Sequence, residues 1–136
     1  MDQPAAPPLI LVAEDDLSNS EVIASTLTDF GGYRVVTEAD GEQVMRRIDE
    51  AQPDLLLLDL LLPNRSGLEI LRELRHHPRF AALPIIAISA DVRPGIGEQA
   101  RALGCREFIA KPFGIDQLLD SVAHALTARP ETRDNG

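Results

Sequence analysis

A few polar residues stand where apolar segments of the sequence end, and their side chains could carry out chemistry. Glu14 and Asp15 follow the first apolar run, Asp59 the third, Ser89 the fourth and Lys111 the last. If these runs are parallel strands, their carboxyl ends meet at one edge of the sheet, where α/β proteins bind ligands. Crowded carboxylates repel one another unless a cation lies among them, and Mg²⁺, or Mn²⁺ in its place, prefers oxygen ligands. Ser89 and Lys111 add a hydrogen-bond donor and a positive charge, so the sequence predicts phosphoryl transfer to a carboxylate.

Lys111 is the only lysine in the chain, because the other 12 of its 13 cationic residues are arginines. An arbitrary cationic position in this sequence would therefore be occupied by arginine. A compact ammonium on a flexible stem can enter a crowded metal site that a planar guanidinium would overfill. The residue type thus favours a specific role for Lys111 at the predicted site.

Five short apolar runs divide the chain and indicate strands at residues 9–13, 33–37, 55–58, 84–88 and 108–110. Four of them are almost continuously apolar, which is typical of strands covered on both faces and so of a parallel sheet. Between them, apolar residues recur at helical spacing. These are Val22, Ile23, Leu27 and Phe30; Val44, Ile48 and Ala51; Leu68, Leu71 and Leu74; Ile96, Ala100 and Leu103; and Leu118, Leu119, Val122 and Leu126. The sequence therefore predicts an α/β fold with the pattern (βα)5, a doubly wound, five-stranded parallel sheet with helices on both faces.

Capping signals place some of the helix boundaries. The candidates for helix starts are Asp16 as an N-cap, Ser18 with Glu21 as a capping box, Asp40 in a solvated loop and helix start, and Pro94 at a first helical position. The glycines expected in a left-handed or positive-φ conformation are Gly31, Gly67 and Gly104. Gly95 and Gly97 lie early in the fourth predicted helix, whose apolar residues are Ile96, Ala100 and Leu103, so we expect this helix to begin late or to fray.

Length and composition exclude several classes of protein. A chain of 136 residues with 44% hydrophobic and 26% charged residues is predicted to form one domain over residues 9–128, with loose tails at 1–8 and 129–136. The net charge is −9 and neither half of the chain is strongly basic, which argues against direct nucleic-acid binding. No apolar run approaches the length of a membrane span. The start lacks signal-peptide features and Cys105 is the only cysteine, expected to fill packing space, so we expect a cytoplasmic protein.

The order and spacing of the polar positions resemble those of the receiver domains of two-component response regulators, in particular stand-alone, chemotaxis-regulator-like receivers. The resemblance extends from Leu9 to Leu126. The matching motifs are Glu14-Asp15, Asp59, Pro63 and Gly67 in the loop after it, Ser89-Ala90 and Lys111-Pro112-Phe113. Each motif is weak alone, but together and in this order they are specific. The resemblance implies the flavodoxin-like strand order 2-1-3-4-5.

The resemblance also implies roles for the site residues. Asp59 would be the phosphoacceptor, and Lys111 would pair with it at rest and with a phosphoryl oxygen afterwards. Asp15, Asp59 and the backbone carbonyl of Leu61 would bind Mg²⁺ directly. Glu14 replaces an aspartate that is common in the family, and its longer side chain favours a contact through water.

Ser89 and Phe108 are expected to form the switch. Ser89 would bond to the phosphoryl group, and Phe108 stands three residues before Lys111 at the aromatic switch position, without the hydroxyl of the commoner tyrosine. The face formed by the helix at 96–103, the strand at 108–110 and the last helix would then contact a downstream target. The resemblance further implies a cis Lys111–Pro112 peptide bond.

We therefore expect a single-domain response regulator that accepts a phosphoryl group on Asp59 from a histidine kinase or phosphotransfer protein, and that catalyses only its own phosphorylation and dephosphorylation. Two alternatives stay open: an interaction module that does not need phosphorylation, and a receiver that is part of a larger regulator or hybrid kinase. A haloacid dehalogenase-like phosphatase is disfavoured because Leu61 stands where a second aspartate is needed. A flavodoxin-like electron carrier is disfavoured because the loop after the first strand is acidic.

Overall fold

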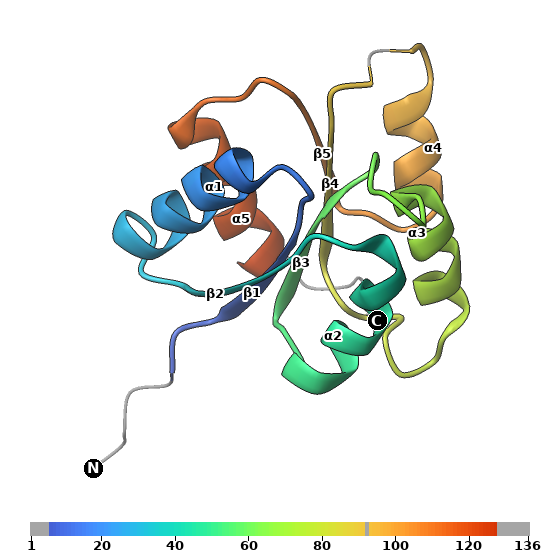
Figure 1. Ribbon diagram of the computed structural model, residues 1–136, viewed down its shortest axis with the longest axis horizontal. Coiled ribbons are helices and arrows are strands. Elements are labelled where there is room, and N and C mark those ends of the chain that lie inside the picture. The colour runs from blue at the N-terminus through green and yellow to red at the C-terminus, as the bar shows by residue number, and fades with distance from the viewer. Residues whose placement is uncertain (1–5, 92, 128–136) are drawn as a thin grey trace.

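The computed structural model describes residues 6–91 and 93–127, which form a three-layer α/β fold (Figure 1). The elements are β1 (Leu9–Ala13), α1 (Leu17–Asp29), β2 (Arg34–Glu38), a 3₁₀ helix η1 (Gly41–Gln43), α2 (Val44–Ala51), β3 (Leu55–Asp59), α3 (Gly67–His76), β4 (Ile85–Ser89), α4 (Ile96–Ala102), β5 (Glu107–Ala110) and α5 (Ile115–Thr127). All strand pairs are parallel, in the order β2-β1-β3-β4-β5. The predicted (βα)5 fold and strand order are thus confirmed.

The sheet is covered on both faces, as the continuous apolar runs predict. Helices α1 and α5 lie on one side of the sheet and α2, α3 and α4 on the other (Figure 1). Successive side chains of β1 alternate between the two layers: Ile10 and Val12 pack with α1 and α5, whereas Leu11 and Ala13 pack with the other three helices. The central strands β3 and β4 are buried at every position. Burial on both faces fixes the register, because a slip by one residue would exchange the two sets of side chains.

The strand predictions are accurate to about one residue, whereas only some of the predicted helix starts agree with the structure. Asp16 is the N-cap of α1, as expected, and its carboxylate accepts a hydrogen bond from the third residue of the helix. The capping box predicted at Ser18 and Glu21 is wrong, because α1 already begins one residue before Ser18. A capping box instead starts α3, where Ser66 and Glu69 bond to each other's backbone N–H groups.

Helix α4 begins late, at Ile96, as its glycines predict. Gly95 precedes it with φ of 88°, a left-handed conformation, so Pro94 lies in the turn before the helix and not at its first position. Gly104 has the expected positive φ of 103° after α4. After α1 the positive φ belongs to Gly32 and not to Gly31, which corrects the prediction.

Gly67 serves a different purpose from the predicted one. It is the first residue of α3 and does not have a positive φ. A Cβ atom there would lie 2.6 Å from Leu60 Cα and 2.7 Å from the carbonyl oxygen of Asp59. Glycine therefore allows the start of α3 to approach the backbone at the end of β3, directly beside Asp59.

Cys105 fills packing space, as expected. It lies in the core cluster with α2, α3 and α4 and is only 6% exposed. Burial raises the pKa of its thiol to about 11, so the reactive thiolate is scarce at neutral pH.

The ends of the chain are described only in part. Residues 1–5 and 128–136, which hold most of the two predicted tails, lie outside the described residues. Pro7 and Pro8 do lie within them, and their carbonyl oxygens accept hydrogen bonds from Arg34. Among the described helices, none combines the length and the apolar composition needed to cross a bilayer.

We predict that Gly67→Ala lowers the free energy of unfolding by about 1–3 kcal/mol, the usual cost of overpacking, because the added methyl group meets backbone atoms that cannot turn aside. Urea denaturation would measure the loss. The matched control is Gly114→Ala, where a Cβ atom meets nothing within 4 Å. Its expected loss is less than about 1 kcal/mol, from weaker capping of α5. Equal stability of Gly67→Ala and wild type would contradict this role of Gly67.

Candidate functional site

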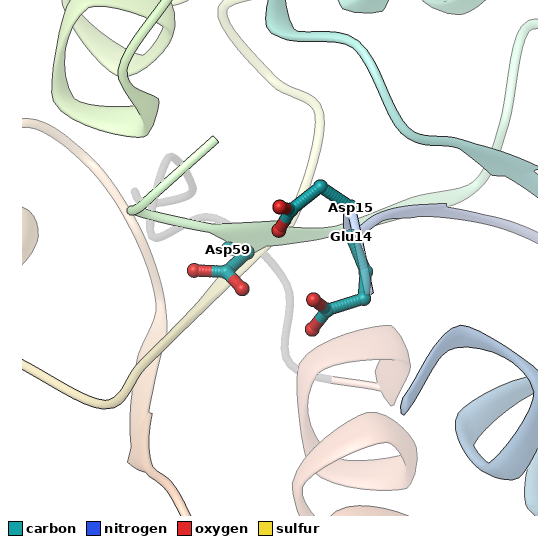
Figure 2. A group of neighbouring side chains, drawn as sticks. All are labelled: Glu14, Asp15 and Asp59. Carbon is teal, nitrogen blue, oxygen red and sulfur yellow. The ribbon is translucent and has the colours of Figure 1, made fainter. Parts of the chain in front are cut away.

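Three carboxylates meet at the carboxyl edge of the sheet (Figure 2). Glu14 and Asp15 directly follow β1, and Asp59 ends the adjacent strand β3. One carboxylate oxygen of each residue lies within 4.8 Å of those of the other two. Glu14 and Asp59 are buried, at 2% and 3% exposure, whereas Asp15 is exposed. The cluster is thus open to solvent on the side of Asp15 and enclosed at its base.

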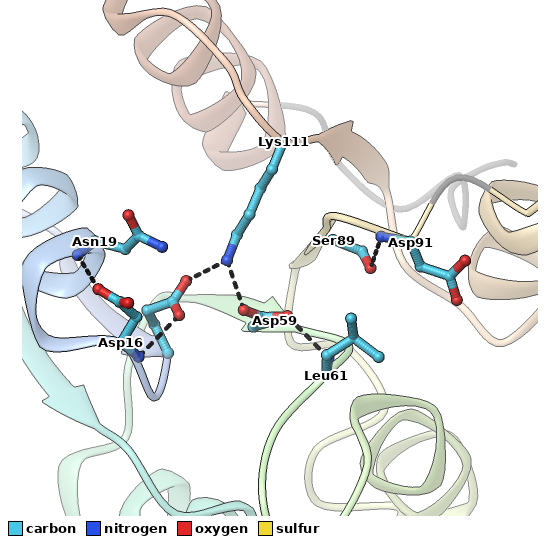
Figure 3. A network of polar contacts seen from close by, with 8 residues as sticks. Asp16, Asn19, Asp59, Leu61, Ser89, Asp91 and Lys111 are labelled. Atoms are coloured by element: carbon cyan, nitrogen blue, oxygen red, sulfur yellow. Dashed lines mark hydrogen bonds and ion pairs between the residues drawn. The ribbon is translucent and has the colours of Figure 1, made fainter.

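Lys111 extends from the end of β5 into this cluster (Figure 3). Its Nζ lies 2.7 Å from Glu14 Oε1 and 2.7 Å from Asp59 Oδ2. The Lys111–Pro112 peptide bond is cis, as predicted. Burial lowers the pKa of Lys111, but the hydrogen bonds to Asp59 and Glu14 outweigh this effect and the pKa is raised overall. The ammonium therefore stays charged and offsets one of the three negative charges.

Glu14 is bonded through both of its carboxylate oxygens. Its Oε1 accepts from Lys111, and its Oε2 accepts from the backbone N–H of Asp16 at 3.1 Å. Burial nevertheless raises the pKa of Glu14, and the nearby Asp59 charge adds to this, despite the opposing hydrogen bonds. The ionised form of the side chain is thus less stable in this site than in water.

Asp59 is held through both of its carboxylate oxygens. Oδ2 accepts from Lys111, and Oδ1 accepts from the backbone N–H of Leu61 at 2.8 Å. Leu61 is 56% exposed, while its neighbours Leu60 and Leu62 are buried in the core. The loop after β3 is therefore anchored on either side of Leu61 and leaves Leu61 beside the carboxylate cluster.

Ser89 ends β4 and is completely buried. Its hydroxyl oxygen accepts a hydrogen bond from the backbone N–H of Asp91 at 3.0 Å (Figure 3). Within the described residues, no acceptor is found for the hydroxyl proton itself. A buried hydroxyl with unused donor capacity is suited to an incoming anionic oxygen.

Phe108 lies in β5 and is half-buried. Its ring packs against the cluster shared by α2, α3 and α4. A Cβ atom on Gly97 of α4 would lie 3.2 Å from Phe108 Cδ2. The aromatic ring is therefore in direct contact with the helix that the family resemblance connects to output.

The donor set fits a divalent cation. Three carboxylates with one ammonium leave an excess of negative charge in a partly buried place, and hard oxygen ligands of this kind suit Mg²⁺. Glu14, Asp15 and Asp59 are the residues that could hold the cation, and all three are predicted from the sequence.

Two polar contacts beside the site are not predicted from the sequence. Arg93 Nη2 lies 2.6 Å from Asp91 Oδ2 in the loop after Ser89. Asn64 Nδ2 donates to Asp40 Oδ1 at 2.9 Å, and this bond lowers the pKa of Asp40. Asp40 does begin a helix, the 3₁₀ turn η1, by accepting from Glu42 N. No local pattern in the sequence indicates its contact with Asn64, because the two residues are 24 positions apart.

The raised pKa of Glu14 predicts an unusual pH dependence of stability. A carboxyl whose pKa is higher in the folded state stabilises the fold below its unfolded pKa and loses this contribution as pH rises through the folded pKa. Without metal, Glu14→Gln should therefore be more stable than wild type at neutral pH, and the difference should shrink towards pH 4. Thermal unfolding in EDTA between pH 4 and 8 measures both curves. A variant that is less stable than wild type at pH 7 would contradict burial as the dominant influence on this carboxyl.

Comparison with known proteins agrees with this geometry. The family model for the response regulator receiver domain matches residues 10–123. The phosphate regulon transcriptional regulatory protein PhoB of Rhizobium meliloti is 35% identical over 125 residues, which cover 91% of this chain and 55% of PhoB. The polar-differentiation response regulator DivK of Brucella anthropi is 28% identical over 116 residues, covering 85% of this chain and 94% of DivK. The chain thus spans about half the length of PhoB and nearly all of DivK.

A solved structure gives the same result in three dimensions. It is the receiver domain of the sensor histidine kinase PA1611 from Pseudomonas aeruginosa, with a magnesium ion coordinated in its active site cleft. It superposes with a TM-score of 0.81 at 32% identity, covering 90% of this chain and all of the other. The family match over most of the sequence, the fold and the predicted resemblance therefore agree: this chain belongs to the response regulator receiver domains of two-component signalling.

Proposed function

We propose that the protein accepts a phosphoryl group on Asp59 from a phosphohistidine, in a reaction that requires Mg²⁺, and signals through changed protein contacts. The observation that carries this proposal is the placement of Asp59 Oδ2 at 2.7 Å from Lys111, inside the carboxylate cluster with Glu14 and Asp15. A nucleophilic carboxylate beside a fixed cation is suited to attack on phosphorus, because the developing charge meets a preorganised partner.

In the proposed transfer, a carboxylate oxygen of Asp59 forms a bond to phosphorus while the bond from phosphorus to the histidine nitrogen breaks. The imidazole leaves with that electron pair. Lys111 is already in place to pair with one phosphoryl oxygen, and the Ser89 hydroxyl can donate its proton to another. Later attack of water on phosphorus breaks the bond to the Asp59 oxygen, releases inorganic phosphate and restores the Asp59 carboxylate.

The proposed Mg²⁺ ligands are the carboxylates of Asp15 and Asp59 and the backbone carbonyl of Leu61. Bound Mg²⁺ would neutralise phosphoryl oxygens and orient them, and Mn²⁺ could take its place. Both oxygens of Glu14 are already engaged, by Lys111 and by Asp16 N–H, which favours an indirect contact through water. The magnesium ion in the cleft of the PA1611 receiver supports this part of the proposal.

The proposed output is a shift of the α4, β5 and α5 face. A phosphoryl oxygen would draw Ser89 and the end of β4 inward, opening space for the ring of Phe108. Because Phe108 has no hydroxyl, its inward position would be stabilised by burial alone, so the ring should be inward part of the time even without phosphate. A ligand shifts such an equilibrium only by its differential affinity for the two states. The short helix α4 is preceded by Gly95 and carries Gly97 against the ring, and we expect it to be the element that moves.

We further propose a cytoplasmic location, a histidine kinase or histidine phosphotransfer protein as donor, and a protein target on the α4, β5 and α5 face. The relatives support two settings for the domain. DivK is matched over nearly its full length, whereas PhoB is longer and the PA1611 receiver belongs to a sensor kinase. A receiver that acts alone and one within a longer protein would use the same site.

Phosphoryl uptake tests the proposal directly. Wild-type protein incubated with acetyl phosphate and Mg²⁺ should gain the mass of one phosphoryl group, and Asp59→Asn should gain none, because an amide cannot form the acyl phosphate. Chelation of Mg²⁺ should abolish uptake by wild type. The matched control is Asp16→Asn, which keeps an N-cap oxygen next to the site and should be labelled like wild type. Full labelling of Asp59→Asn would refute the assignment, and no labelling of wild type would favour the phosphorylation-independent module.

The switch is tested by NMR with beryllofluoride and Mg²⁺, which imitate the phosphorylated state. We expect amide shifts in residues 93–113 as well as in the loops around Asp15 and Asp59. In Ser89→Ala the shifts in the loops should persist and those in α4 and β5 should be largely lost, because the inward pull is missing. Shifts confined to the loops in the wild-type protein would exclude this switch.

A further inference from the structure

The loop between β3 and α3, residues 60–66, is attached to a second loop that contributes nothing to the carboxylate cluster. Asn64 Nδ2 donates to Asp40 Oδ1 at 2.9 Å, and Gly41 N–H donates to the carbonyl oxygen of Pro63 at 3.1 Å. We refer to Asp40, Gly41, Pro63 and Asn64 as the loop clamp. It joins the connection between β2 and α2 to the loop that carries Leu61.

The backbones in the loop clamp are in close contact. A Cβ atom on Gly41 would collide with the carbonyl oxygen of Arg65 and would lie 2.8 Å from that of Pro63. Asn64 has φ of 69°, a left-handed conformation that asparagine tolerates better than most residues. Glycine at position 41 and asparagine at position 64 are therefore suited to the backbone contact within the loop clamp.

The Asp40 side of the clamp is itself fixed. Asp40 N–H donates to Glu38 Oε2 at 3.0 Å, and Asp40 Oδ1 also accepts from Glu42 N–H at 2.9 Å. Glu38 in turn lies 3.3 Å from Arg47 Nε of α2. The loop clamp thus bonds the loop after β3 to a segment that contacts with β2, η1 and α2 already hold in place.

The inner end of the same loop is held by the sheet and by α3. Leu60 N–H donates to Ile88 O at 2.9 Å, and Gly67 N–H donates to Leu60 O at 3.1 Å. Leu61 lies between these bonds and the loop clamp. Beyond Leu61 the loop is held by the buried side chain of Leu62 and, at Pro63 and Asn64, by the loop clamp.

We infer that Asp40 and Asn64 are positioning residues for metal binding, because they hold the backbone of Leu61 where its carbonyl can serve the cation. This inference rests on the proposed role of that carbonyl as a Mg²⁺ ligand. Groups that orient metal ligands contribute to metal affinity without touching the metal. The loop clamp acts on a backbone ligand in this indirect way.

The test is the Mg²⁺ affinity of the full chain. It is measured from the NMR shifts of the Asp15 and Leu61 amides during titration with Mg²⁺ alone. Asn64→Asp places two carboxylates face to face and breaks the bond, and Asn64→Gly removes the amide while tolerating the left-handed backbone. Both should weaken Mg²⁺ binding by roughly threefold to tenfold, less than the loss of a direct partner of a metal ligand. The added charge of Asn64→Asp would by itself strengthen cation binding, so the loop clamp and simple electrostatics predict opposite signs.

The exchanged pair Asp40→Asn with Asn64→Asp restores an amide-to-carboxylate bond at the wild-type net charge. It should recover the Mg²⁺ affinity of wild type to within about twofold if the hydrogen bond is the cause. Glu50→Gln, which breaks an exposed ion pair with Arg46 on α2, is the matched control and should leave affinity unchanged. Unchanged or stronger binding by Asn64→Asp, or no recovery in the exchanged pair, would overturn the inference.

A wrong Mg²⁺ ligand set can be distinguished from a wrong role of the loop clamp. If Asp15→Asn bound Mg²⁺ as wild type does, or if wild type showed no saturable shifts, the proposed ligand set would be wrong and the inference would fall with it. If Asp15→Asn lost binding while both Asn64 variants kept it, only the role of the loop clamp would be refuted.

Discussion

The repulsion among three carboxylates at one edge of the sheet is the constraint on which the rest of the site depends. Glu14, Asp15 and Asp59 come together because β1 and β3 are adjacent and parallel, and only Lys111 offsets their charge among the described residues. Lys111 is 97 positions from Glu14 and 52 from Asp59. The contact therefore exists only when the sheet is complete through β5, so the fold and the charge balance of the site are formed together.

Burial destabilises the ionised form of Glu14 in this arrangement. Desolvation raises its pKa even though Lys111 and a backbone N–H bond to it. A divalent cation bound among these carboxylates would favour their ionised forms.

Close backbone approach is the second requirement. Gly67 lets α3 begin against the carbonyl of Asp59, and Gly41 lets the connection after β2 reach the loop that carries Leu61. Neither contact could form around a side chain without a shift of backbone. The β3 to α3 loop is therefore held from the sheet, from α3 and from the loop clamp, which gives a solvent-facing segment the rigidity expected of a binding site.

The sequence by itself determined the alternation of strands and helices and the residues at the strand ends. Both are local signals: apolar runs and helical spacing show burial within a few residues, and the type of Asp59 or Lys111 is visible at its own position. Only the tertiary structure decided how these residues pair. The sharing of Lys111 between Glu14 and Asp59 and the contact of Asp40 with Asn64 depend on distances between separate loops. Gly67 is a further example. Its sequence position indicated a special role, but the atoms that a Cβ would meet belong to a segment that only folding brings beside it.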